Sequence, residues 1–479
     1  MQTEASSRVI LLGLDFGSTT SSALIASAKV ARSSATGHMQ LDDVQVIYKS
    51  EPVFTPFVKQ NIDTEKVAKL ITSWLNESDV SIKDIFSGGS MITGLAAQAD
   101  NAAALSKLIL EMVGESVIAT ADDPCLESWL AFKGSCGALS RYHADTPIIN
   151  FDIGGGTTNV ALGNIALGVN GDALQTGCYF IGARHFQFVA GGYQLTALSS
   201  YGAALLKSLN IKKQIGAFLN AAEVASIMGF YVSALKAIAL GDKPFFNSPI
   251  AQKHMQVAIE IKPKTKANIA FSGGVGELLY KISAGETLPT TTFYGDFGID
   301  FALAISRSAL LSADLKTCIP EHKGRATVVG LTLHSTAISG NTIYLPKPDC
   351  LPLRDLPIIA KLAADAPMEQ WQNAFTLTAK RPAGACIQIT ACNKTLEQVR
   401  TLAIQIKHAL QASKYAPSQP IVILLEANIG KALGNYISNW GQLDYNLIVI
   451  DEVALRDAHF VHIGRIQQGM IPVSFYGLN

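Results

Sequence analysis

Residues 150–159 read NFDIGGGTTN, an apolar run that ends near an aspartate and is followed by glycines and hydroxyl side chains. The apolar run predicts a buried strand with the carboxylate of Asp152 near its carboxyl end. The glycines allow a tight turn and let the backbone approach a bound anion closely. A shorter copy of this pattern, LDFGSTT, occupies residues 14–20. A single copy is typical of any hairpin, but two copies predict a duplicated β-unit that holds one polyphosphate.

The side chains of the two turns suit a phosphate group and its metal ion. We expect Asp15 and Asp152 to face a hydrated Mg²⁺ from opposite sides, because Mg²⁺ gives up its waters reluctantly. The alternative is that each aspartate only caps its own turn by accepting backbone N–H bonds. The residues predicted to cradle the phosphates are Gly17, Ser18, Thr19, Thr20, Gly154, Gly155, Gly156, Thr157 and Thr158.

The bulk composition restricts the class of protein. The chain has 479 residues, enough for about two to four domains, and its hydrophobic fraction of 48% supports a large core. Lys plus Arg and Asp plus Glu both number 38, so the formal net charge is zero. This balance argues against a nucleic-acid partner or an anionic membrane. No uninterrupted apolar run reaches the ~18 residues that span a bilayer, and Val9–Leu14 is expected to be a strand rather than a signal peptide.

Seven cysteines are scattered along the chain, and none has CxxC spacing. They are Cys125, Cys136, Cys178, Cys318, Cys350, Cys386 and Cys392. The odd count and the spacing disfavour both a zinc site and a disulfide framework. We therefore expect free thiols in a reducing, cytoplasmic environment.

The predicted elements repeat once within the first 345 residues. The first set comprises strands at 8–16, 20–30 and 45–49, a helix at 64–76 that Thr64 can cap, a strand at 84–87, a helix at 95–113, a strand at 116–120 and a helix at 124–133. The second set comprises strands at 147–152, 159–162 and 165–169, a helix at 215–240, a strand at 267–271 with a helix after it, and helical segments at 293–311 and 327–335. This repetition predicts two subdomains, residues 1–145 and 146–345.

Prolines are dense where the second subdomain is expected to end, at Pro346, Pro348, Pro352 and Pro357. Beyond them the predicted helices are 368–379, 396–411 and 430–437, and the predicted strands are 386–390, 421–426, 447–451 and 471–475. This alternation predicts a third unit, a C-terminal α/β region at residues 346–479.

A third glycine turn, SGGVGE at residues 272–277, follows the predicted strand at 267–271. With the two phosphate turns, it resembles the nucleotide-binding set of the actin, hexokinase and DnaK-type chaperone superfamily. The resemblance implies an actin-like ATPase fold of duplicated ribonuclease-H-like subdomains, with ATP or ADP and Mg²⁺ as ligands. It also implies that Gly273, Gly274 and Val275 receive the adenosine and that Glu277 lies near the ribose. The alternative is a strand-to-helix turn that needs glycine for its backbone alone.

The same resemblance gives a role to Glu127, which lies where the superfamily places a carboxylate or glutamine near the attacking water. With Asp15 and Asp152 it would complete the catalytic set. The alternative is a surface glutamate that the helix dipole favours near a helix start. None of these residues is a strong nucleophile, so the set is consistent with slow ATP hydrolysis that times a conformational change.

Over its whole length the chain resembles a narrower family, EutA, the reactivating factors of coenzyme-B12-dependent ethanolamine ammonia-lyase. The likeness is carried by the triplet turn and by residues 50–56, 92–94, 126–128, 181–184, 272–277, 326–330, 352–357, 430–434 and 449–453. It implies an ATP-dependent chaperone that binds the lyase when its adenosylcobalamin is damaged, releases the spent cobalamin and allows reloading. It further implies a cytoplasmic protein associated with an ethanolamine-utilisation microcompartment, with a homodimer among the assemblies it allows.

The chain departs from the family pattern in three places. Leu95-Ala96 replaces a Glu-Ser pair, Gly182-Ala183 replaces a glycine pair, and residues 331–333 replace small residues, which would crowd a close helix approach. The rival functions are a sugar or small-acid kinase of the same fold, a reactivase of diol or glycerol dehydratase, and a cytoskeletal polymer protein.

Three further motifs give only weak signals. Gly430-Lys431 lacks the upstream glycine and the following hydroxyl of a P-loop. His459 and His462 are expected to be packed or exposed side chains rather than metal ligands. Arg184 next to His185 is a weak indication of a nucleotide or partner contact.

Overall fold

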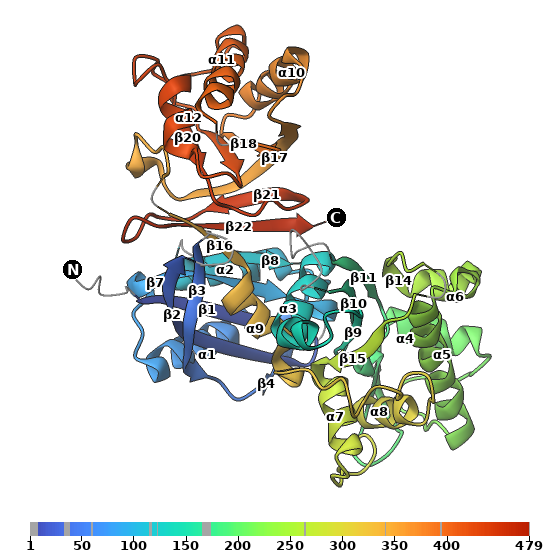
Figure 1. Ribbon diagram of the computed structural model, residues 1–479. Coiled ribbons are helices and arrows are strands. Elements are labelled where there is room, and N and C mark those ends of the chain that lie inside the picture. Colours follow the sequence, from blue (N-terminus) through green and yellow to red (C-terminus); the bar gives the residue numbers. More distant parts are fainter. Residues whose placement is uncertain are drawn as a thin grey trace.

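The computed structural model describes residues 8–32, 39–58, 61–114, 117–121, 123–164, 174–262, 265–340, 342–392 and 395–478. Three larger sheets organise these residues (Figure 1). Each of two lobes contains one sheet, and the third sheet belongs to the C-terminal part, which lies above the first lobe in Figure 1.

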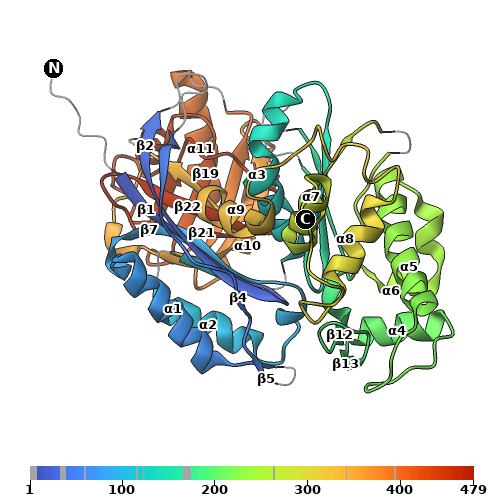
Figure 2. The ribbon, with the colours of Figure 1, turned by 90° about the horizontal axis from the view of Figure 1, so that it is seen from below.

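The first lobe is built on a sheet with the strand order β3-β2-β1-β7-β8. Its strands are β1 (Arg8–Phe16), β2 (Thr20–Arg32), β3 (Met39–Lys49), β7 (Ile85–Ile92) and β8 (Val117–Ala121), accompanied by the short β4 (Val53–Phe54), β5 (Phe57–Val58) and β6 (Asn61–Ile62). β1 pairs antiparallel with β2 and parallel with β7. The helices α1 (Thr64–Ser78) and α2 (Ala102–Val113) lie together on this lobe (Figure 2) and contribute Val67, Ile71, Leu105 and Ile109 to its core.

The second lobe repeats this arrangement. Its strands are β9 (Ile148–Ile153), β10 (Thr158–Gly163), β11 (Gln175–Tyr179), β14 (Met255–Val257) and β15 (Asn268–Ser272), in the order β14-β11-β10-β9-β15. β9 is antiparallel to β10 and parallel to β15. The order β11-β10-β9-β15 therefore matches β3-β2-β1-β7, strand for strand and direction for direction. The duplication predicted from two glycine turns is confirmed, and the chain has the predicted α/β, actin-like fold.

The rest of the second lobe is a helical layer around an aromatic core. Its elements are β12 (Phe186–Phe188), β13 (Leu195–Leu198), α4 (Ser200–Ser208), α5 (Ala221–Leu240), α6 (Pro249–Lys253), α7 (Gly273–Ser283) and α8 (Gly298–Ser306). Among the described residues, α5 alone has the length and apolar composition that would suffice to cross a bilayer. Its side chains Ile227, Tyr231 and Leu235 are nevertheless buried in the core of this lobe, as in an ordinary core helix.

Several predicted bounds in the lobes were wrong. The predicted strand 84–87 is the longer β7, which continues through Gly88 and Gly89; a Cβ on Gly88 would lie 1.9 Å from the carbonyl oxygen of Leu12, so the strand needs glycine there. The predicted helix 95–113 consists of a 3₁₀ turn, η2 (Gly94–Ala96), and the shorter α2. The predicted segment 293–311 contains only α8 as an α-helix.

Capping residues explain two other corrections. The N-cap of α1 is Asp63, whose carboxylate accepts the Lys66 N–H, and not Thr64. The predicted helix 215–240 begins only at Ala221, because Asn220 and Glu223 form a capping box that fixes its start. The predicted strand 165–169 lies outside the described residues, and the described antiparallel partner of β10 is β11.

Two helices cross between the lobes, α3 (Pro124–Tyr142) and α9 (Ala326–His334), and they pack against each other (Figure 2). A Cβ on Gly134 of α3 would lie 2.1 Å from the carbonyl oxygen of Ala326. A Cβ on Gly330 of α9 would lie 2.1 Å from the carbonyl oxygen of Leu130. This pair of glycines sets the close crossing of the two helices.

The crowding expected from residues 331–333 does not occur. Leu331 is buried in a cluster with Met91, Trp129 and Leu130, so it fills space beside the crossing. Thr332 faces β1, where a Cβ on Gly13 would lie 2.2 Å from the Thr332 hydroxyl oxygen. The larger residues are accommodated because the helix separation is decided at Gly134 and Gly330.

The C-terminal sheet has the order β16-β22-β21-β17-β18-β19-β20. Its elements are β16 (Thr336–Ser339), β17 (Leu353–Ala363), β18 (Ala385–Thr390), β19 (Ile421–Leu425), β20 (Leu447–Ile450), β21 (Ala458–Ile463) and β22 (Ile471–Leu478), with the helices α10 (Met368–Ala379), α11 (Leu396–Ala412) and α12 (Gly430–Ile437). The strands β17 to β20 are parallel, and β16, β21 and β22 add antiparallel pairs. The proposed domain boundary at residue 346 falls between β16 and β17 of this sheet.

Candidate functional site

The two glycine turns have the same backbone geometry. In the first, the Gly17 N–H donates to the carbonyl oxygen of Thr20 at 2.9 Å, and in the second the Gly154 N–H donates to the carbonyl oxygen of Thr157 at 2.9 Å. Asp15 therefore stands opposite Ser22 across one hairpin, and Asp152 stands opposite Asn159 across the other. Each hairpin delivers one carboxylate to the same structural position in its lobe.

The two turns touch each other at the junction of the lobes. A Cβ on Gly155 would lie 2.1 Å from Thr19 Oγ1 and 3.3 Å from Ser18 Cβ. A Cβ on Gly94 would lie 2.3 Å from Ser18 Oγ and 3.5 Å from Thr157 Oγ1. The residues predicted to bind phosphates from opposite lobes are thus brought to one place.

A hydroxyl group faces each aspartate from the neighbouring parallel strand. Thr93, at the end of β7, donates to Asp15 Oδ1 at 3.5 Å, and Ser272, at the end of β15, donates to Asp152 Oδ1 at 2.5 Å. Both hydroxyl residues precede a glycine with positive φ, Gly94 at 57° and Gly273 at 76°. The duplication therefore includes the residues that hold the aspartates, which the sequence analysis did not assign. The repeated hydroxyl–glycine pair after the parallel strand was the signal that could have identified them.

The surroundings of both aspartates raise their pKa values. Burial, with a further contribution from the charge of Asp152, raises the pKa of Asp15 from 3.8 to about 7, against the opposing hydrogen bond from Thr93. Burial raises the pKa of Asp152 to about 6, and the Ser272 hydrogen bond limits the rise. Carboxylates with raised pKa values in one place form a site that a cation would stabilise.

Glu127 joins this pair from α3. Its side chain is buried, and burial followed by the charges of Asp15 and Asp152 raises its pKa well above the usual value, while a hydrogen bond with Asn159 opposes the rise. The alternative of a surface glutamate is excluded by this burial. The start of α3 is fixed by Asp123, whose Oδ1 accepts the Leu126 N–H at 3.1 Å.

The residues fit a hydrated metal ion better than a directly bound one. Within the described part of the chain, no three His, Cys, Asp or Glu side chains are grouped so that they could hold a metal ion directly. The charge of Asp152 nevertheless raises the pKa of Asp15, and both aspartates raise the pKa of Glu127, so the three carboxylates lie near enough together to hold Mg²⁺ through its waters. Thr19 Oγ1 is buried without a hydrogen-bond partner, as expected of a hydroxyl that awaits a phosphate oxygen.

The turns are supported from outside by neighbouring segments. Thr55, next to β4, donates its N–H to the Thr19 carbonyl at 3.0 Å and its hydroxyl to the Gly17 carbonyl at 2.7 Å. On the second turn, the N–H groups of Ala183 and Arg184 donate to the carbonyls of Gly154 and Gly155 at 3.1 and 2.6 Å.

Some predicted phosphate ligands are placed less favourably. The hydroxyl of Thr158 donates to the Ile181 carbonyl at 2.6 Å, so that group supports the fold. Thr20 is exposed at the start of β2. Of the predicted phosphate ligands, Ser18 and Thr19 of the first turn and Gly155 and Thr157 of the second lie at the contact between the turns.

The predicted adenosine element lies beside the second phosphate turn. A Cβ on Gly273 would lie 2.5 Å from the Ile153 carbonyl oxygen, whereas Gly274 has open space around it. Val275 is buried in the core, so only its backbone is available to a ligand. Glu277 is half exposed, forms a 2.9 Å ion pair with Lys281 and lines a cavity of about 400 Å³ with Tyr280 and Lys323.

Arg184 is nearer to the site than the sequence suggested. Its guanidinium lies 3.9 Å from Asp296 in the second lobe and 5.9 Å from the Phe54 ring centre in the first lobe. Burial lowers its pKa, and the charge of Asp296 opposes this. The neighbouring His185 is buried and hydrogen-bonded to Ser199 at 2.8 Å, which indicates a structural role.

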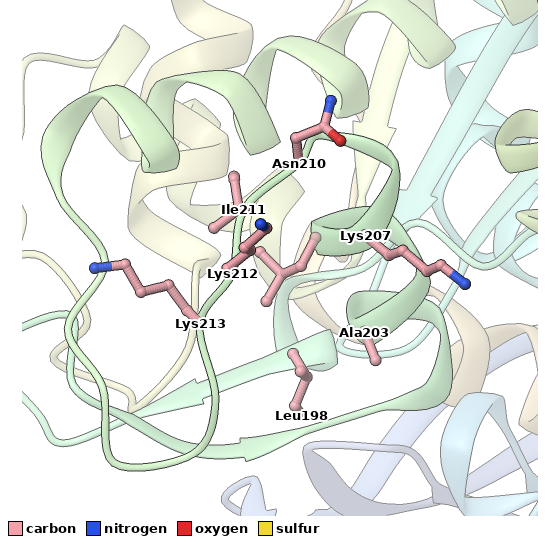
Figure 3. A pocket seen from close by; sticks show the side chains of 8 residues that line it. Leu198, Ala203, Lys207, Asn210, Ile211, Lys212 and Lys213 are labelled. Carbon is pink, nitrogen blue, oxygen red and sulfur yellow. The ribbon is translucent and has the colours of Figure 1, made fainter.

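Two other features do not form ligand sites. A cavity of about 340 Å³ in the second lobe is lined by Lys207, Lys212 and Lys213 among others, but the side chains of Lys207 and Lys213 extend in opposite directions (Figure 3) and Lys213 is 3.8 Å from Glu223. The N-terminus of α12 is occupied by the protein itself, since Asp451 Oδ2 accepts the Gly430 N–H at 2.6 Å. None of the seven cysteines, all within the described residues, forms a disulfide bond in the structure.

The family model and the curated relatives match nearly the full chain. The model of a family described as Ethanolamine utilisation protein EutA matches residues 7–478. The chain is 27% identical to the ethanolamine ammonia-lyase reactivase EutA of Salmonella typhimurium and 25% identical to that of Escherichia coli, and each match covers 98% of both proteins. Among solved structures, a Ppx/GppA family member from Aquifex aeolicus is similar over 94% of this chain and 95% of its own, with 12% identity and a TM-score of 0.34.

Proposed function

The chain belongs to the EutA family of ethanolamine utilisation proteins, and on this premise we propose that it is an ATP-driven chaperone that reactivates adenosylcobalamin-dependent ethanolamine ammonia-lyase. The proposed partner is the lyase whose cobalamin is damaged, and the proposed result is release of the spent cobalamin and reloading with adenosylcobalamin. The relatives named as reactivases support this role. The observation that carries it is the convergence of Asp15, Asp152 and Glu127 where the two glycine turns touch.

In the proposed cycle the turns bind MgATP through backbone N–H groups and hydroxyls, and Thr19 supplies a hydroxyl oxygen that is otherwise unpaired. Bound Mg²⁺ supplies positive charge that offsets both the phosphates and the aspartates. Asp15 and Asp152 would hold the ion through its waters. Glu127, whose pKa is raised by burial and by the two aspartates, orients the attacking water and accepts its proton.

Hydrolysis acts as a switch because the two aspartates come from different lobes. While the last phosphoryl group is bound, both turns share one ligand and the lobes stay closed. Its loss removes that shared ligand and lets the lobes rotate about α3 and α9. To drive release of cobalamin strongly, the two nucleotide states must differ by several kcal/mol, about 5 for a nearly complete shift, in their preference for the closed form.

A reactivation assay tests the proposal. Ethanolamine ammonia-lyase inactivated with cyanocobalamin is incubated with the protein, ATP, Mg²⁺ and adenosylcobalamin, and ammonia release is followed. Activity should return with ATP, stay absent without nucleotide, and stay absent with the Asp152→Ala variant. Failure of ammonia release to recover under the complete conditions overturns the proposal. Diol dehydratase treated in the same way is the partner control, and its recovery in place of the lyase would assign a different client.

A further inference from the structure

The C-terminal sheet is bonded to the residue that starts the Glu127 helix. Asp123 caps α3 by accepting the Leu126 N–H on Oδ1 at 3.1 Å, and its Oδ2 accepts the Gly477 N–H at 2.6 Å. Gly477 lies near the end of β22, the second strand of the C-terminal sheet counted from its β16 edge. Asp123 is buried, so both hydrogen bonds are shielded from water. One carboxylate thus joins two parts of the molecule that are 354 positions apart in the chain.

A second contact joins the C-terminal part to α3. The guanidinium of Arg456, from the segment between β20 and β21, lies 4.4 Å from the ring centre of Trp129. It also lies 5.6 Å from the ring centre of Phe475 in β22. Trp129 is buried, and it stands only two positions after Glu127. The C-terminal part therefore holds the first two turns of α3, one through its cap and the other through a cation–π contact.

Along α3, Glu127 lies between these two contacts. Its N–H donates to the Asp123 carbonyl at 2.9 Å, so its place on the helix depends directly on the capping residue. Its carboxylate feels the charges of Asp15 and Asp152. A small rotation or retreat of the first turn of α3 would therefore move Glu127 relative to the two aspartates, and misplacement by about 1 Å is enough to slow chemistry by about 100-fold.

We propose that Asp123 is a positioning residue through which the C-terminal sheet sets the place of Glu127 and, with it, the rate of nucleotide hydrolysis. This inference rests on the proposed ATPase role of the same site. It gives the C-terminal part a function in timing: a change at β22 reaches the water-orienting carboxylate through one side chain. The proposed binding of nucleotide itself depends on the glycine turns.

The Asp123→Asn variant keeps the cap of α3 and breaks the bridge to Gly477; because it also removes a charge that raises the pKa of Glu127, kcat is compared on the plateau of each pH profile. Asparagine is as good an N-cap as aspartate, so the bond to Leu126 persists, but its amide N–H₂ then faces the Gly477 N–H and the bridge is lost. We expect kcat for ATP to fall by about tenfold or more while KM and the affinity for ADP stay within about twofold. Asp123→Ser, which caps but is too short to reach Gly477, should behave in the same way. The matched control is Asp63→Asn, at the N-cap of α1, which should leave both constants unchanged.

The cation–π contact between Arg456 and Trp129 allows a second test of the proposal. Arg456→Ala should lower kcat in the same direction, whereas Arg400→Ala, which removes an arginine 5.4 Å from the ring centre of Tyr436 in the C-terminal part, should not. In the double variant, the combined fall in kcat should be smaller than the product of the two single effects, because both substitutions act on the same turns of α3. Wild-type kcat in Asp123→Asn and Asp123→Ser, with the wild-type protein active, overturns this inference alone. A wild-type protein without ATP hydrolysis overturns the proposed function instead.

Discussion

At the scale of single residues, the two aspartates differ in how far their charge is compensated. Ser272 donates a 2.5 Å hydrogen bond to Asp152, whereas the Thr93 hydroxyl is 3.5 Å from Asp15. The stronger donor accompanies the smaller shift, a pKa of about 6 for Asp152 against about 7 for Asp15. Asp15 is therefore the carboxylate that gains most from a bound cation.

This difference predicts a stability that depends on pH. The pKa of Asp15 is raised from 3.8 to about 7 in the folded protein, so its contribution to stability is complete below about pH 4 and is lost as the pH rises through 7. Asp15→Asn removes the charge and should be more stable than the wild type by about 1–3 kcal/mol near pH 8 without metal, with no difference near pH 4. Urea unfolding in EDTA across this range measures the effect. The exposed Asp145→Asn is the control, and an equal response of both variants would contradict the assignment.

The contact between the turns predicts an effect on ligand binding. Gly155→Ala places a Cβ 2.1 Å from Thr19 Oγ1 and should push the turns apart, lowering the affinity for MgATP on the order of tenfold or more. Gly229→Ala, in α5 of the same lobe, is the control, since its Cβ meets nothing within 4 Å. Titration calorimetry with ATP and Mg²⁺ compares them. Equal affinities would show that the lobes need not approach this closely to bind nucleotide.

The site could be predicted from the sequence as far as its repeated motif extends. Asp15, Asp152 and the glycines follow apolar runs, and this order of residue types is visible without a structure. The hydroxyl–glycine pairs that contain Thr93 and Ser272 are also visible in the sequence, but which aspartate each hydroxyl faces depends on strand order within each sheet. The burial of Glu127 and the commitment of the Thr158 hydroxyl to Ile181 also depend on packing that local sequence does not encode.

At the scale of elements, local patterns predicted the bounds of helices and strands correctly where the apolar periodicity is clear. α10 and α12 lie at their predicted bounds, and β1 does as well. β17 was missed because the dense prolines up to Pro357 suggested a domain boundary. Pro357 is tolerated there because the strand pairs with β21 at that point and with β18 only from Ile358 onward. β21 was missed because exposed His459 interrupts its apolar pattern.

The crossing of α3 and α9 predicts that Gly→Ala substitutions in these helices change the free energy of unfolding in opposite directions, depending on position. Gly330→Ala would place a Cβ 2.1 Å from the Leu130 carbonyl oxygen and should destabilise the fold by about 1–3 kcal/mol, and Gly134→Ala should act alike. Gly137→Ala, on the same helix α3, meets nothing within 4 Å and should stabilise the protein by about 0.5–1 kcal/mol. Chemical unfolding of the three variants decides the matter. Stabilisation by all three would mean that the crossing is not set by the glycine pair.

At the scale of the whole molecule, the C-terminal part is joined to the first lobe. Arg32, at the end of β2, makes two hydrogen bonds to Glu452, of 2.5 and 3.0 Å. The Ser87 hydroxyl in β7 lies 2.7 Å from that of Thr336 in β16. With Asp123 and Gly477, these contacts link the C-terminal sheet to the first lobe and to α3. These contacts join the first lobe, α3 and the C-terminal sheet into one connected unit.

This attachment predicts how the molecule responds when Arg32 is removed. Glu452 has only 2% of its side chain exposed, so Arg32→Ala leaves a buried carboxylate with the Asn428 amide as its remaining side-chain donor among the described hydrogen bonds. We expect a loss of about 1–3 kcal/mol in the free energy of unfolding, partly restored by adding Glu452→Gln, which removes the uncompensated charge. Lys361→Ala, which breaks an exposed 2.8 Å ion pair with Asp457, is the control and should change stability little. Calorimetry should also show the C-terminal part unfolding ahead of the lobes in Arg32→Ala. A single transition at the wild-type temperature would mean that the remaining contacts alone hold the two parts together.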